Sequence, residues 1–115
     1  MDEEMRAYLD IESGLARLRG NATLYRRMLG IFLNGAELEA FETAIAQDDF
    51  QHASEAAHAL KGMAGNLSLD AVAKYSDILT ESLRKGGYEA SDLEAYRDAV
   101  VKTRGYIEAY LSEPS

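Results

Sequence analysis

Apolar residues recur at steps of three and four along most of the chain, the spacing that forms one buried face of a helix. The first long stretch follows Asn21, a residue type that favours helix N-termini, and continues to Ile45. Gly35 interrupts it and is expected to bend this helix. The stripe consists of Leu24, Met28, Ile31, Leu38 and Ile45.

Two more stripes follow. Asp48 or Asp49 is expected to cap the second long helix, which runs to Leu67. Ser68 is expected to cap the third, which should end at the glycine pair 86–87. The apolar positions are Phe50, Ala53, Ala57, Leu60, Ala64 and Leu67 in the second helix, and Leu69, Val72, Tyr75 or Ser76, Leu79 and Leu83 in the third.

A fourth long helix is expected to begin at Ser91 and continue to about residue 112, and a short helix at about 11–19 could cover one end of the core. The only proline is Pro114, so no helix interior contains one. No segment alternates strictly enough to predict a strand. The predicted fold is therefore all-α: an antiparallel four-helix bundle at about 21–112, capped by one or two short N-terminal helices.

Composition fits a single domain over residues 1–115, because 47% hydrophobic and 28% charged residues are ordinary for a globular protein of this length. The absence of cysteine excludes disulfides and thiolate sites. The sequence has no apolar run long enough for a membrane span, and its first ten residues carry acids where a signal peptide carries bases. We therefore expect a cytoplasmic, free-standing monomer.

The net charge is −8, from 12 basic and 20 acidic residues. Such a surface repels polyanions over long range, which argues against a nucleic-acid partner. The same acids could serve only to keep the protein soluble, so the charge by itself names no partner.

His58 is the candidate reactive group. At about 100° per residue it lies about 140° from the middle of the apolar seam of its helix, and so faces outward. The positions that share this outer surface are Ser54, Lys61, Gly62 and Gly65. An ordinary imidazole is largely neutral near pH 7 and can attack phosphorus without a general base, and Lys61 could offset the charge of a phosphoryl group.

Each exposed helix glycine costs about 0.8 to 1 kcal/mol relative to alanine, so Gly62 and Gly65 suggest a surface kept open for close approach. A simpler interpretation stands beside this one. His58 could be a solvated surface histidine, Lys61 an ordinary lysine, and the glycines could mark tight helix packing or, at Gly65, a fraying helix end.

The second histidine does not complete an active site. His52 lies six residues before His58, about 120° away around the helix, so the two cannot form the i, i+4 pair of a zinc site. His52 is expected to be a surface or boundary residue. The sequence also lacks a nucleophile elbow, a phosphate-binding glycine loop and an ATP-binding segment, which favours a carrier over an enzyme.

Residues 57–67, AHALKGMAGNL, resemble the signature of the histidine phosphotransfer family, in which a similar stretch surrounds a phosphorylated histidine. The segment from Gly14 to Tyr25 is similar to the family's lead-in to the first bundle helix, and 48–50 is similar to its acidic step into the histidine-bearing helix. The likeness covers the chain from about residue 10 to residue 111.

This resemblance implies that His58 is the phosphoacceptor, Lys61 its charge partner, and Gly62 with Gly65 the small surface that admits a partner. The partners implied are response-regulator receiver domains and a sensor or hybrid histidine kinase. The chain itself would need no cofactor or metal, because the acceptor aspartate and Mg²⁺ belong to the receiver.

Three finer expectations come from the same resemblance. A polar residue of the following helix often contacts the histidine, and Ser76, Asp77 or Thr80 could do so here. An apolar docking patch could include exposed parts of Ile31, Gly35 and Leu38, although these positions equally suit a core. Ser68 stands where the family often has glycine, and is expected to be a conservative change because serine caps helices well.

The sequence is also compatible with one alternative function. A helical adaptor or regulator could bind a signalling partner through the same surface without phosphoryl chemistry.

Overall fold

The computed structural model describes residues 3–114, which form helices joined by short connections and contain no strand. The predicted all-α class is confirmed. The helices are α1 (Glu3–Tyr8), α2 (Ile11–Arg17), α3 (Ala22–Asn34), α4 (Ala36–Ala46), α5 (Phe50–Leu67), α6 (Asp70–Arg84) and α7 (Ala90–Ser112).

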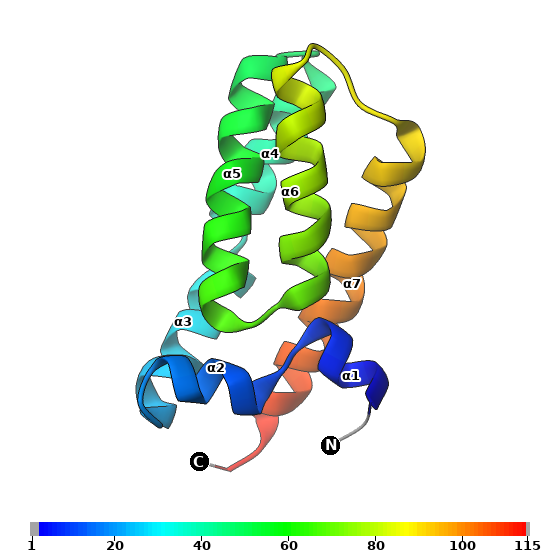
Figure 1. Cartoon of the computed structure of the whole chain (residues 1–115). Helices are drawn as coiled ribbons and strands as arrows, with labels where there is room; N and C mark the ends of the chain where they lie inside the picture. Colours follow the sequence, from blue (N-terminus) through cyan, green and yellow to red (C-terminus); the bar gives the residue numbers. More distant parts are fainter. Residues whose placement is uncertain (1–2, 115) are drawn as a thin grey trace.

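The long helices form the predicted bundle (Figure 1). α5 packs between α4 and α6, and α6 packs in turn against α7. α3 and α4 together make the first leg, and successive legs are antiparallel because their connections are short. The core between them is almost entirely aliphatic and aromatic. Its largest fully buried side chains are Tyr25, Tyr96, Phe32, Phe41, Leu9, Leu29, Leu60, Leu67, Leu69, Leu79, Ile107 and Val72.

Gly35 divides the first leg into two helices. It has φ 76°, in the left-handed region, and its N–H donates to the carbonyl of Phe32 to close the end of α3. A residue in this conformation cannot continue a right-handed helix, and glycine adopts it without a Cβ clash. The expected interruption is therefore a complete break, after which α4 begins at Ala36.

Two of the predicted N-caps are confirmed. The side chain of Asn21 accepts a hydrogen bond from the N–H of Leu24 at 3.0 Å, and Asp49, rather than Asp48, accepts one from His52 at 3.1 Å. The last helix begins one residue earlier than expected, at Ala90, so Ser91 lies within its first turn.

The predicted role of Ser68 is wrong. Ser68 is the C-cap of α5, with φ 59°, and Leu69 precedes α6 without a side-chain cap. Glycine is the residue best suited to this left-handed position, so serine here is not the conservative N-cap change expected. Its hydroxyl donates to the Ser13 hydroxyl at 2.9 Å, and its carbonyl accepts from the N–H of Asp10 at 3.0 Å.

These bonds attach the short N-terminal helices across one end of the bundle. α2 packs on α3 and α5, and α1 on α6 and α7. Gly14 of α2 is buried against Tyr25, and a Cβ at Gly14 would overlap the tyrosine ring. The Tyr25 hydroxyl donates to the carbonyl of Leu67 at 2.8 Å, and burial raises the pKa of this phenol. The predicted capping segment is thus held by specific contacts at the end of the α5 helix.

Candidate functional site

His58 lies on the outer side of α5 and is exposed, as the helical phase predicted. The helix places it there because Ala57 and Leu60, on the other side, are fully buried in the core. The imidazole is therefore accessible to a second protein.

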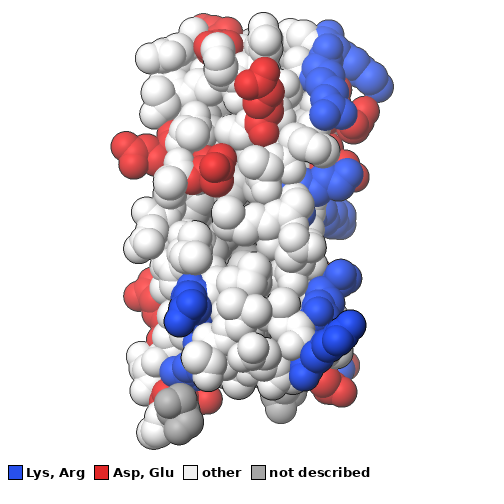
Figure 2. Space-filling view, turned by 90° about the vertical axis from the view of Figure 1, so that its left-hand side faces the viewer, with Lys and Arg blue, Asp and Glu red and all other residues white. Residues whose placement is uncertain are grey.

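The two glycines that follow His58 face open space. A Cβ added at Gly62 or Gly65 would meet no other atom within 4 Å, so neither glycine is required by packing within the domain. The interpretation of these glycines as sites of tight helix packing is excluded. The side of the molecule that carries α4 and α5 has few charges over its middle, and its basic residues gather mainly along one edge (Figure 2).

Lys61, one turn after His58, forms an ion pair with Asp77 of α6. The Nζ and Oδ1 atoms are 2.9 Å apart, and the two side chains are 45% and 49% exposed. Among the three polar candidates from the following helix, Asp77 is the one that reaches the outer surface beside this part of α5. The carboxylate contacts the lysine that was expected to assist His58.

The other two candidates and Ser54 do not belong to the exposed surface. Thr80 is buried and its hydroxyl donates to the carbonyl of Ser76 at 2.7 Å. Ser76 is also buried. Ser54 is 8% exposed and its hydroxyl donates to the carbonyl of Gln51 at 2.8 Å. Ser54 lies seven residues before Lys61 and therefore on the same side of α5. This side faces α6, whose Asp77 pairs with Lys61.

The expected docking residues are split by the structure. Ile31 is 54% exposed and Gly35 is half-buried, but Leu38 is only 7% exposed and is a core residue. A small hollow between the first leg and α5 joins this region to the histidine-bearing helix. Its lining consists of Ile31, Phe32, Ala36, Glu37, Leu38, Leu60 and Met63.

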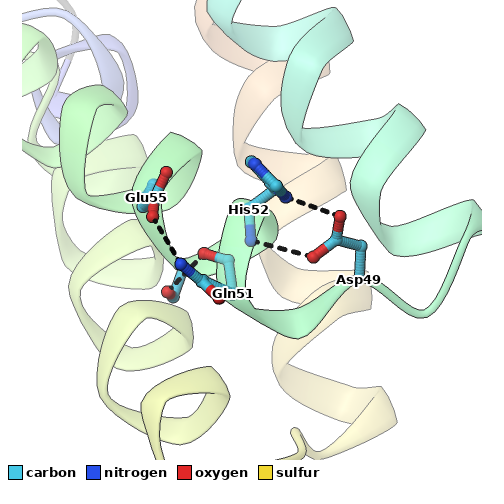
Figure 3. A network of polar contacts seen from close by, with 5 residues as sticks. Asp49, Gln51, His52 and Glu55 are labelled. Carbon is cyan, nitrogen blue, oxygen red and sulfur yellow. Dashed lines mark hydrogen bonds and ion pairs between the residues drawn. The ribbon is translucent and has the colours of Figure 1, made fainter.

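His52 is exposed, as expected, but it has a partner that the sequence analysis missed. Its Nδ1 lies 2.6 Å from Oδ2 of Asp49, the residue that also caps α5 (Figure 3). Hydrogen bonds from the backbone and side chain of His52 lower the pKa of Asp49, and the hydrogen bond to Asp49 with its charge raises the pKa of His52. The sequence signal for this pair is the spacing Asp-x-x-His, which places the imidazole next to the carboxylate that caps the same helix.

This pair gives a direct pH test. The imidazole of His52 should titrate above the ordinary value of about 6.5 in an NMR pH titration, and should return toward it in Asp49→Asn. Asparagine keeps one oxygen to cap the helix but replaces the other with an NH2 group, so the substitution removes both the charge and the acceptor that holds Nδ1 of His52. Because the pKa of His52 is raised on folding, the stability it contributes is present at low pH and lost as the pH rises through its folded-state pKa. An unchanged midpoint in Asp49→Asn would contradict the assigned pair.

Neither a metal cluster nor a membrane-spanning helix is found between residues 3 and 114. No group of three or more histidine, aspartate or glutamate side chains there could hold a metal ion. No helix in the same range is long and apolar enough to cross a membrane.

Comparison with known families agrees with the geometry of the site. The family model described as Hpt domain matches residues 27–112, which include α5 with His58 and Lys61, and α6 with Asp77. The chain belongs to the Hpt domain family. Comparisons with curated proteins and with solved structures give no match.

Membership confirms the family resemblance of residues 57–67. Hpt domains are helical bundles that carry phosphoryl groups in two-component signalling, where they interact with receiver domains and kinases. As a member of this family, the chain has a histidine phosphotransfer role in two-component signalling.

Proposed function

We propose that His58 accepts a phosphoryl group from the phosphoaspartate of a receiver domain, or from a histidine kinase, and passes it to the aspartate of another receiver. The observation that supports this best is the exposed imidazole on a helix face where Gly62 and Gly65 leave open space. A reacting phosphorus atom held by another protein needs that access.

The transfer balances without an added reactant. The lone pair of the unprotonated ring nitrogen attacks phosphorus, the N–P bond forms, and the P–O bond to the donor carboxylate breaks. The carboxylate leaves with the electron pair, and the proton on the other ring nitrogen can pass to water. In onward transfer the ring takes a proton back from water, a receiver carboxylate attacks phosphorus, and the N–P bond breaks so that neutral imidazole leaves with the electron pair.

The surrounding residues have simple parts in this scheme. Lys61 offsets the charge of the phosphoryl group as a point charge. The chain supplies no cofactor, since Mg²⁺ would be held by the receiver. We further propose that the carrier works as a cytoplasmic monomer whose single domain spans residues 1–115, and that it has no nucleic-acid or membrane partner.

The test is transfer of radiolabelled phosphate from a panel of phosphorylated receiver domains to the wild-type protein. Label that is acid-labile and stable to alkali, and that maps to the peptide containing His58, is expected. If no receiver or kinase labels the folded protein, the carrier function fails and an adaptor that binds without transfer replaces it.

A further inference from the structure

The ammonium group of Lys61 already has an anionic partner. Asp77 holds it across the α5–α6 contact at 2.9 Å, with both side chains about half exposed. Exposed ion pairs of this kind contribute little to folding stability, because water screens them and two flexible side chains must be ordered. The contact between Lys61 and Asp77 is therefore easily exchanged for another.

Phosphorylation of His58 would offer Lys61 a stronger anion. A phosphoryl group carries about −1.5 to −2 charges near pH 7, against one for a carboxylate, and presents three acceptor oxygens. Lys61 is three residues from His58, one helical turn along the same surface, so its flexible side chain can serve either anion. Asp77 and the phosphoryl group then compete for one lysine.

We propose that Asp77 is a positioning residue that acts through Lys61: by competing for the ammonium group, it weakens the stabilisation that Lys61 gives to the phosphoryl dianion on His58. This inference rests on the proposed function of His58. A carrier must release its phosphoryl group as readily as it accepts it, and an exchangeable lysine prevents the phosphorylated state from becoming a trap.

The inference can be tested without a partner protein. Phosphoramidate phosphorylates histidine directly: the imidazole nitrogen attacks phosphorus and ammonia leaves. The second ionisation of the phosphoryl group is then followed by ³¹P NMR as a function of pH, with His58→Gln identifying the signal. When a free Lys61 stabilises the dianion, the monoanion loses its proton more readily.

Asp77→Asn should raise the acid dissociation constant of the phosphoryl group about two- to fivefold, the range expected for one exposed ion pair. In a Lys61→Gln background the same substitution should produce a change at least about twofold smaller, because the lysine through which it acts is gone. Asp98→Asn is the matched control: it removes one charge from an exposed carboxylate of α7 that pairs with Lys102 at 3.2 Å, and because α7 packs on α6 rather than on α5, it should have little effect.

Each outcome decides the inference. No change in Asp77→Asn, a fall in the constant, or equal changes with and without Lys61 would overturn it. Failure of receivers to label wild type, with these couplings intact, would instead refute the carrier function while leaving the competition for Lys61 established.

Discussion

Replacing His58 with glutamine should abolish phosphoryl transfer to the domain while leaving its fold intact. Glutamine keeps a polar side chain of similar reach but has no ring nitrogen with a lone pair to attack phosphorus. Because His58 is exposed, the free energy of unfolding should change by no more than about 0.5 kcal/mol. Labelling from phosphorylated receivers should fall to background, and thermal unfolding followed by circular dichroism should match wild type.

The second histidine supplies the matched control. His52 is on the same helix, is exposed and is also an imidazole, but its Nδ1 is bonded to Asp49 and it lies outside the glycine-lined surface. His52→Gln should therefore keep full labelling. Equal labelling of wild type and His58→Gln, or loss of label in His52→Gln alone, would assign the phosphoryl group to another residue. Failure of His58→Gln to fold would mean that the imidazole has a structural role.

Most helices of this protein could be predicted because their apolar positions keep one period over long stretches. The buried face of the first helix was predicted wrongly: Tyr25, Leu29 and Phe32 are buried there, whereas Ile31 of the predicted stripe is 54% exposed. Helix ends were less predictable. Asn21 and Asp49 follow the rule that such side chains precede helices, but Ser68 obeys a different constraint. Only Leu69 separates Ser68 from the start of α6, so Ser68 must turn the chain out of α5 in a left-handed conformation. A propensity for N-caps carries no information about that φ angle.

The site was predictable to the extent that one helix decides it. The phase of α5 alone places His58 outward and Leu60 inward. The burial of Ser54 and Thr80 depends instead on how α6 is rotated against α5, which single-helix periodicity does not specify. The same packing selects Asp77 as the partner of Lys61. Contacts between helices are thus the part of the site that the sequence pattern could not predict.

A bulky side chain at Gly62 should impair transfer severely without harming the fold. The space beyond Gly62 is open, so Gly62→Leu creates no clash within the domain and should raise helix stability by somewhat less than the roughly 1 kcal/mol gained by Gly62→Ala. A receiver must bring its phosphorylated aspartate to His58 across this surface. We expect the leucine to lower the transfer rate at least about tenfold, which corresponds to about 1.4 kcal/mol, and the alanine to lower it less.

Gly105 of α7 provides a control that separates the effect of replacing any exposed helix glycine from the effect of filling the space beside His58. It is also an exposed helix glycine with open space around it, but α7 packs on α6 rather than on α5. Gly105→Leu should stabilise the helix in the same way and leave transfer unchanged. Stopped-flow or quenched labelling measures the rates, and chemical denaturation the stabilities. If Gly62→Leu transfers as fast as Gly105→Leu, the open surface beside His58 is not where the partner docks, and the cost of Gly62 has some other cause.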